Sequence, residues 1–327
     1  MTDVILKPQP MPLLRPIDGQ NYQIVHYQRA GVTHRVFDNA RVYGPGVVVT
    51  GDGVMHGAGM TYSDHPSFLG RGEALTPEDA YVDEELTLLW GFHVWDETIP
   101  CNWSHFIWTY LMRLAFTDPT SLLVSERVPD RFLDWARVLD FTKFVAVRDG
   151  DMVRRLHAPS VVCHRDAQGM PSVLPSAVYR LRERLGIGLP PVGRTRIYIE
   201  RGQSSPWRRI LNEAELMTAL TAQGFRCISP ERMTVHEQLE VMAAAEVVVN
   251  PFGGASAITM FAPEDCRVVE LAFPGIVGSF AGTMWADVLG QDYKRVDGVA
   301  GEQTGSLAID KDYTVPVDEV LRRVDGH

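Results

Sequence analysis

Short apolar runs alternate along the chain with segments in which apolar residues recur at helical spacing. The runs at 47–50, 122–125 and 143–147 are brief and rich in β-branched residues, which is typical of buried strands. Between the last two runs, apolar residues from 132 to 139 recur three and four positions apart, which indicates one face of a helix. The N-terminal half is therefore expected to alternate strands with helices.

The same alternation is more regular after residue 195. Strands are expected at 196–200, 225–228, 246–250 and 267–271. Asn212 and Thr234 each stand three residues before a glutamate, which is the capping-box pattern of a helix start, and a third, short helix is expected at 255–261. Gly224 ends the first of these helices. Right-handed crossovers would wind the series into a Rossmann-like parallel sheet.

Proline and glycine positions indicate how the chain divides. Four prolines in the first sixteen residues predict an extended arm, because proline lacks the backbone donor that a helix needs. Three glycines and two prolines at 186–195 predict an interdomain linker, and helical spacing from 317 to 324 predicts a final amphipathic helix. The expected division is an arm at 1–19, an N-terminal α/β domain at 20–185, a linker at 186–195, a C-terminal Rossmann-like domain at 196–304 and a last helical segment at 305–327.

Composition narrows the class of partner. The chain has 327 residues and is 45% apolar, which is enough for about two domains and excludes a wholly disordered protein. Its 31 basic and 41 acidic residues give a formal net charge of −10. Such a balance argues against nucleic acid as a partner, so an anionic ligand would need a local cluster of cations.

Cysteine usage and hydropathy bear on the compartment. The four cysteines are scattered, without a CxxC pair or a metal-ligand spacing, which argues against a disulfide framework or a zinc ribbon. The sequence shows no signal-peptide pattern and no apolar run long enough to cross a membrane. These observations predict a soluble, cytoplasmic protein without membrane insertion. The oligomeric state stays open, a homo-oligomer included.

Five arginines gather between positions 194 and 209, where the one acidic residue is Glu200. They stand at 194, 196, 201, 208 and 209. Arg201 follows an expected strand, where open α/β sheets bind ligands, and guanidinium groups match phosphate oxygens two at a time. The loop is therefore a candidate site for a diphosphate. A solvated, arginine-rich loop is the alternative.

The segment at 250–261, NPFGGASAITMF, places two glycines between an expected strand and an expected helix. Glycine allows a ligand to approach the backbone closely, and a helix start offers N–H groups and the positive end of the helix dipole. The turn is thus a second candidate for binding phosphate. It matches neither GxGxxG nor the P-loop, so a turn without a ligand stays open.

An aromatic-rich segment at 101–114 places Asn102 and His105 one turn apart on one helix face. A histidine that titrates near neutral pH can accept the proton of an attacking hydroxyl or thiol, whereas a hydrogen-bonded core histidine is the alternative. The Asp-Gly-Asp sequence at 149–151 offers the paired carboxylates of a metal-dependent sugar transferase. The same three residues favour a turn, which is the interpretation we adopt.

Together these motifs resemble those of glycosyltransferase family 61, which contains bacterial capsular-polysaccharide, plant xylan and animal O-linked sugar transferases. The residues that carry the resemblance keep the family's order and spacing over most of the chain. They are Asn102, His105, Phe106 and Arg113; RIYIER ending at Arg201; Arg208, Arg209, Asn212 and Glu213; Pro230, Glu231, Thr234, Glu237 and Gln238; and then AAAEVVV, the glycine turn, Phe261 and Glu270.

The resemblance implies a GT-B fold, an α/β arrangement of two Rossmann-like domains that face each other across a cleft. Similar enzymes hold a nucleoside-diphosphate sugar in the C-terminal domain and the acceptor in the N-terminal domain, invert the anomeric carbon, and generally need no metal or further cofactor. The expected donor-binding residues are Arg201, Arg208, Arg209, Asn212, Glu237, Gly253, Gly254, Ala255, Ser256 and Glu270. The expected catalytic residues are His105 as general base, Asn102 beside it, and Asp96 and Glu97 in reserve.

Four positions depart from the family pattern. Phe252 and Ile258 replace a histidine before the glycine turn and an asparagine after it, and Thr109 and Met112 replace an acidic residue and a proline that follow His105. The donor nucleotide and its sugar therefore stay open. So does the acceptor, a glycan or a small molecule joined through oxygen or sulfur. A family member that binds the nucleotide sugar without turnover is the alternative.

Overall fold

The computed structural model describes most of the chain. The described residues are 2–18, 21–43, 47–50, 55–56, 81–90, 103, 106–125, 128–148, 150–161, 175–187, 194–201, 207–276, 282–305 and 308–325. The chain divides into two compact units: unit 1 contains Met1–Met11 and Tyr27–Leu185, and unit 2 contains Pro12–His26 and Gly186–His327.

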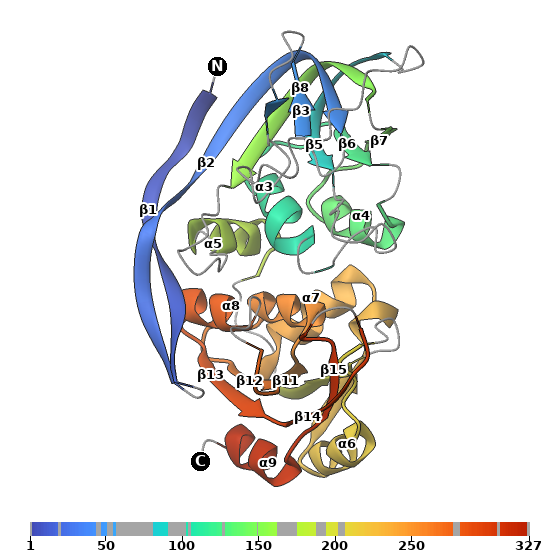
Figure 1. Ribbon diagram of the computed structural model, residues 1–327. Helices are drawn as coiled ribbons and strands as arrows, with labels where there is room; N and C mark the ends of the chain where they lie inside the picture. The colour runs from blue at the N-terminus through green and yellow to red at the C-terminus, as the bar shows by residue number, and fades with distance from the viewer. Residues whose placement is uncertain are drawn as a thin grey trace. The chain divides into compact units, whose positions relative to one another are not determined.

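Unit 1 is built on a mixed sheet in the order β4-β3-β2-β8-β5-β6-β7, with β1 beside β2 (Figure 1). The strands are β1 (Thr2–Asp18), β2 (Asn21–Tyr43), β3 (Val47–Val49), β4 (Met55–His56), β5 (Tyr81–Trp90), β6 (Leu122–Ser125), β7 (Phe144–Val147) and β8 (Met152–Val161). The end of β1 and the start of β2, within Pro12–His26, are assigned to unit 2. The strands β8, β5, β6 and β7 run parallel, whereas β2 pairs antiparallel with β8 and β3, and β3 with β4.

The structure confirms the strands predicted in the N-terminal half and adds others. β3, β6 and β7 lie where the runs at 47–50, 122–125 and 143–147 predict them. The antiparallel strand β2 is not predictable from the pattern of the sequence, because its polar and apolar residues follow no strict alternation. This antiparallel part of the sheet departs from the Rossmann-like domain expected for this half, while the parallel part agrees with an α/β protein.

The helices described in unit 1 are η1 (Phe106–Leu111), α3 (Met112–Leu114), α4 (Asp130–Arg137) and α5 (Pro175–Arg184). Two of them, η1 and α4, bury aromatic side chains. α4 confirms the predicted helical spacing and buries Phe132 and Trp135. The ring centroids of these two residues lie 5.1 and 5.3 Å from that of Trp103, so Trp103 packs against α4.

Unit 2 contains an all-parallel sheet in the order β10-β9-β11-β12-β13. Its strands are β9 (Thr195–Ile199), β10 (Phe225–Ile228), β11 (Ala245–Pro251), β12 (Arg267–Ala272) and β13 (Asp292–Asp297), and its helices are α6 (Glu213–Ala222), η2 (Pro230–Arg232), α7 (Val235–Ala243), η3 (Gly254–Phe261), α8 (Gly282–Leu289) and α9 (Val317–Asp325). α7 and α8 cover one face of the sheet, and α6 and α9 cover the other (Figure 1). The order of strands and helices predicted from 196 to 271 is confirmed, and β13 adds a strand that was not predicted.

The two predicted capping boxes have different outcomes. At the start of α7, Thr234 Oγ1 accepts from the N–H of Glu237 at 3.3 Å, and the Glu237 carboxylate accepts from the N–H of Thr234 at 2.7 Å, so this box is confirmed. At the start of α6 the prediction is wrong. Asn212 instead donates through Nδ2 to the carbonyl of Val315 at 2.9 Å and accepts through Oδ1 from its N–H at 2.9 Å. A distant backbone segment competes for the side chain, which sequence spacing cannot reveal.

The C-terminal segment completes the core of unit 2. β14 (Val299–Gln303) and β15 (Lys311–Thr314) form an antiparallel pair, and α9 follows them. α9 buries Val320 and Val324 in one cluster with Leu216 and Leu220 of α6. The predicted amphipathic helix is confirmed, although β15 occupies part of the segment that was expected to be helical.

Candidate functional site

The strand order of unit 2 reverses between β9 and β11. The chain passes from β9 to β10 on one side and then crosses to β11 on the other. In open α/β sheets, ligands bind beyond the carboxyl ends of the strands at such a switch point. β9 ends at Ile199 and β11 at Pro251, so the residues that follow them are Arg201 and the Gly253-Gly254 turn. The fold thus brings together the two motifs that the sequence singles out for phosphate.

The side chain of Arg201 joins these two turns. Its Nη1 donates to the carbonyl of Phe252 at 3.1 Å, and its Nη2 and Nε donate to the carbonyl of Trp207 at 2.9 and 3.3 Å. The backbone N–H of Arg201 donates to Glu213 Oε1 at 2.9 Å, which also accepts from the hydroxyl of Tyr198 at 2.8 Å. Arg201 is therefore positioned through both its backbone and its guanidinium.

Arg201 is a cation at neutral pH. Burial, and after it the neighbouring charge of Arg208, lower the pKa of Arg201 to about 10. This pKa still lies well above neutrality, so the side chain keeps its charge. A guanidinium fixed at a switch point is suited to a phosphate group, with which it forms charge-assisted hydrogen bonds.

Gly253 is required where the guanidinium meets the glycine turn. Its φ of 153° and ψ of −172° lie in a region that residues with a side chain rarely adopt. A Cβ atom at this position would overlap Nη1 of Arg201. The sequence suggests that this glycine admits a ligand. In the structure it also admits the side chain of Arg201.

Replacing Gly253 by alanine is expected to destabilise unit 2 and displace Arg201. Gly275→Ala is the matched control, because Gly275 also has a positive φ, of 104°, but has open space where a Cβ would stand. Both variants carry the backbone strain, about 1–3 kcal/mol, whereas Gly253→Ala must also break hydrogen bonds of Arg201, worth about 1 kcal/mol or more. Urea denaturation measures the difference. Equal losses in the two variants would contradict the contact between Gly253 and Arg201.

The other four arginines of the loop are paired with aspartates that are distant in the sequence. The pairs are Arg194–Asp265, Arg196–Asp325 at 3.1 Å, Arg208–Asp310 at 3.7 Å and Arg209–Asp312 at 2.6 Å. The charge of +4 counted along the sequence therefore overestimates the positive field of this loop, because carboxylates from 265–325 fold against it. Donor contacts by Arg208 and Arg209 stay a prediction.

β15 holds the loop at 207–213 in place. The N–H of Leu211 donates to the carbonyl of Tyr313 at 2.8 Å, and the N–H of Tyr313 donates to the carbonyl of Arg209 at 3.0 Å. Nε and Nη2 of Arg209 donate to the carboxylate of Asp312 at 2.9 and 2.6 Å. These bonds raise the pKa of Arg209 and lower that of Asp312 despite the opposing effect of its burial. The candidate site therefore depends on the C-terminal segment.

The two departures around the glycine turn are core residues. Phe252 is 7% exposed and Ile258 is fully buried. The guanidinium carbon of Arg208 lies 5.4 Å from the centroid of the Phe252 ring, a cation–π distance. Burial lowers the pKa of Arg208, and its pairing with Asp310 opposes this shift. At position 252 the family pattern has a histidine, whereas here a phenylalanine ring packs against the guanidinium of Arg208.

The start of η3 offers its backbone rather than its serine. The hydroxyl of Ser256 donates to the carbonyl of Gly253 at 2.6 Å, and its N–H donates to the same oxygen at 3.1 Å. Gly254 and Ala255 lie in the first turn, where helical N–H groups have no acceptor within the helix. We expect phosphate oxygens to meet these two N–H groups, whereas the hydroxyl of Ser256 closes the turn.

The expected donor-binding glutamates have other partners. Glu270 is fully buried in β12, where its Oε2 accepts from the hydroxyl of Tyr293 at 2.8 Å. Asn250 lies in register with it on β11, and within the described residues its buried Oδ1 has no hydrogen-bond partner. Glu237 is the capping residue of α7, and its bonds to Thr234 lower its pKa. A contact of Glu237 or Glu270 with the donor stays a prediction.

The expected catalytic residues lie outside the described residues, as does one carboxylate of the Asp-Gly-Asp sequence. These residues are Asn102, His105, Asp96, Glu97 and Asp149. Of the same helix motif, Arg113 is fully buried with its guanidinium carbon 5.3 Å from the ring centroid of Tyr110. The N–H of Asp151 donates to the carbonyl of Arg148 at 3.2 Å, which is the hydrogen bond of the expected turn. In the part of the chain that the structure describes, no three His, Cys, Asp or Glu side chains are arranged to hold a metal ion.

Three residues position the site without having been expected to do so. Glu213 is one of the residues that carry the family resemblance, so the sequence contains a signal for it, but not for its bond to the N–H of Arg201. Trp207 supplies a carbonyl to Arg201, and Asp312 pairs with Arg209, but neither contact leaves a local signal, because each depends on how the loop folds.

The parallel sheet and the glycine turn at its switch point define a doubly wound α/β protein with a site suited to phosphate. The family model of glycosyltransferase 61 matches residues 103–269, which is about half of the chain and includes Arg201, the glycine turn and both ends of β11. The chain belongs to glycosyltransferase family 61, and the protein is a glycosyltransferase. A search of curated proteins found no match. Among the described residues, no helix combines the length and the apolar content that a membrane span requires.

Proposed function

We propose that the protein transfers a sugar with inversion, and without a metal ion, from a nucleoside-diphosphate sugar to an acceptor hydroxyl or thiol. One observation carries the donor part of this proposal: the cationic Arg201 and the glycine turn meet at the switch point of the unit 2 sheet. A diphosphate there would receive the charge of Arg201 and the N–H groups at the start of η3. Two Rossmann-like domains facing across a cleft, as in a GT-B fold, would bring the acceptor to this donor.

The proposed chemistry is one displacement at the anomeric carbon. The acceptor oxygen or sulfur forms a bond to this carbon as its bond to the diphosphate oxygen breaks. The proton of the acceptor passes to a base, for which His105 is our candidate, and the electron pair leaves with the nucleoside diphosphate. Fixed positive charge beside the departing diphosphate stabilises the transition state and takes the role that a metal ion has in other transferases.

The test is a calorimetric titration of the full chain with UDP, GDP, ADP, CMP and dTDP and their sugars, followed by turnover with the donor that binds. We expect one nucleotide to bind, transfer to continue after exhaustive treatment with EDTA, and NMR of the product to show an inverted anomeric configuration. Loss of activity with EDTA that Mn²⁺ or Mg²⁺ restores would contradict metal independence. Absence of binding by every nucleotide would contradict the proposed donor class.

A second candidate function is binding of the nucleotide sugar without turnover. The observation that favours it concerns Phe252 and Ile258, which stand where the family pattern has two polar side chains. Both are buried, so neither offers a polar group to a donor at the glycine turn. The same titration decides between the two. Tight donor binding without transfer or hydrolysis across many acceptors would favour the binding module, and transfer to any acceptor would exclude it.

A further inference from the structure

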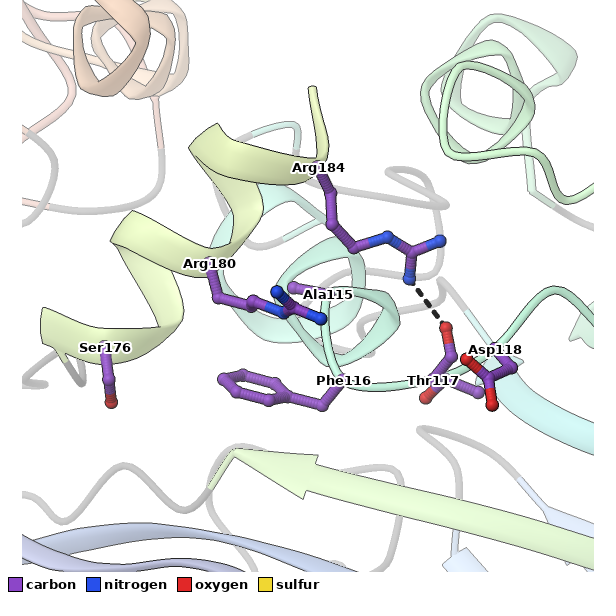
Figure 2. A pocket seen from close by; sticks show the side chains of 7 residues that line it. All are labelled: Ala115, Phe116, Thr117, Asp118, Ser176, Arg180 and Arg184. Atoms are coloured by element: carbon purple, nitrogen blue, oxygen red, sulfur yellow. Dashed lines mark hydrogen bonds between the residues drawn. The ribbon is translucent and has the colours of Figure 1, made fainter. Parts of the chain in front are cut away.

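Unit 1 contains a cavity of about 550 Å³ between α5 and the residues that follow α3 (Figure 2). Its lining combines an aromatic ring, two arginines, an acid and two hydroxyls, from Ala115, Phe116, Thr117, Asp118, Ser176, Arg180 and Arg184. The volume is in the range of sites for small ligands, which is about 300–1,000 Å³. One or two sugar rings would fit in such a space.

One buried hydroxyl in this cavity lacks a hydrogen-bond partner among the residues that the structure describes. Ser176 Oγ is buried, and no partner for it is found among the described residues. A buried hydroxyl left unpaired costs about 1–3 kcal/mol, so such groups in native proteins call for an explanation. Because Ser176 lines the cavity, a polar ligand there would supply the missing partner.

The two arginines that line the cavity differ in their partners. Arg184 donates to three backbone carbonyls, those of Leu114, Thr117 at 2.6 Å and Leu139 at 3.1 Å, so it is anchored by neutral groups. Arg180 pairs with Glu183 at 2.6 Å, but both side chains are at least half exposed, and such surface pairs contribute little. Arg180 is therefore available to exchange Glu183 for a ligand anion, beside the anchored charge of Arg184.

The chemistry of these groups suits a sugar. Figure 2 shows Arg180 and the ring of Phe116 facing the same space, with Ser176 at one end and Asp118 at the other. A sugar presents C–H groups on its ring face and hydroxyls on its rim. The C–H groups suit the apolar face of the Phe116 ring, and the hydroxyls suit the polar groups of Asp118 and Ser176. Arg180 would then meet a negative group on the ring.

We propose that this cavity is an acceptor subsite that binds a sugar carrying a carboxylate, with the carboxylate on Arg180 and ring hydroxyls on Ser176 and Asp118. The proposal rests on the proposed function for its place in the reaction. The binding itself concerns unit 1 alone, whereas the donor is assigned to unit 2. The two are therefore tested separately.

The experiment measures binding of methyl glucuronoside and methyl glucoside to the full chain without nucleotide, by saturation-transfer NMR and calorimetry. The two probes differ in the carboxylate, so we expect the glucuronoside to bind about tenfold more tightly, as a charge-assisted hydrogen bond implies. Arg180→Gln should abolish this difference. Ser176→Ala should weaken both probes several-fold without lowering the melting temperature, since no described residue is a hydrogen-bond partner of the hydroxyl that it removes.

Arg154→Gln is the matched control, because Arg154 pairs with Asp83 on the unit 1 sheet and does not line the cavity. It should leave both affinities unchanged. Equal affinity for the two probes, or a folded Arg180→Gln protein that still distinguishes them, would overturn the proposal. Glucuronoside binding in a protein that binds no nucleotide would support the subsite and contradict the proposed function. Nucleotide binding in a protein that does not distinguish the two probes would support the proposed donor class and contradict the subsite.

Discussion

Replacing Arg201 by alanine is expected to weaken the binding of any nucleoside diphosphate by about 10²–10⁴-fold. Each charge-assisted hydrogen bond to phosphate is worth about 1.5–3 kcal/mol, and a bidentate guanidinium forms two. The side chain also holds the carbonyls of Phe252 and Trp207, so its loss would loosen both turns that meet at the switch point. Calorimetry with the nucleotide that binds the unaltered chain measures the effect.

Arg194→Ala is the control for this experiment. Arg194 and Arg201 flank the same strand, β9, but Arg194 precedes its amino end, is exposed and pairs with Asp265. Its replacement should change nucleotide affinity less than twofold. Arg201→Lys, which keeps the charge and loses the fork, should give an intermediate affinity. A folded Arg201→Ala protein with unchanged affinity would remove Arg201 from the donor site.

Replacing His105 by alanine is expected to lower kcat by about 10²–10⁴-fold, the usual contribution of a general base. One displacement with inversion needs one base on the acceptor side, and donor affinity should therefore stay the same. The loss should be smaller with a thiol acceptor, because the pKa of a thiol lies much closer to neutrality than that of a hydroxyl. Single-turnover measurements with saturating donor separate this effect from binding.

His236→Ala is the control for His105, since His236 is exposed on α7. It should leave kcat unchanged. The rate of the unaltered enzyme should rise with pH through the histidine range, and His105→Ala should remove this rise. Near-normal turnover in a folded His105→Ala protein would assign this histidine a structural role. Asp96 and Glu97 would then be the candidates for the general base.

Elements with strong local signals are predictable from this sequence. The capping box of Thr234 and Glu237 and the apolar run of β11 specify their elements within a few residues, and the order of strands and helices then leads to the parallel sheet. The strand β2 is not predictable in this way, because its pairing with β8 involves residues more than a hundred positions away. Its register depends on that partner and not on its own pattern.

In the candidate site, too, residues with a local sequence signal are predictable and contacts between distant residues are not. Arg201 and Gly253 are identifiable because each follows a strand, and strand ends carry ligands in this class of sheet. Their mutual contact is not identifiable, because it depends on the side chain of one turn reaching the backbone of another. The aspartates at 310 and 312 show the same limit: they neutralise arginines about a hundred residues earlier, so charge counted in a sequence window differs from charge in space.

The attachment of the loop at 207–213 to β15 determines which segments can be exchanged with other family members to make a hybrid protein. A hybrid that took its sheet from this chain and its last residues from another family member would set Arg209 opposite a foreign side chain in place of Asp312. The two bonds of Asn212 to the backbone at Val315 would form only if the new tail followed the same path. The exchangeable module is therefore the sheet together with its C-terminal tail. Donor preference is expected to be inherited with this module and not with the sheet alone.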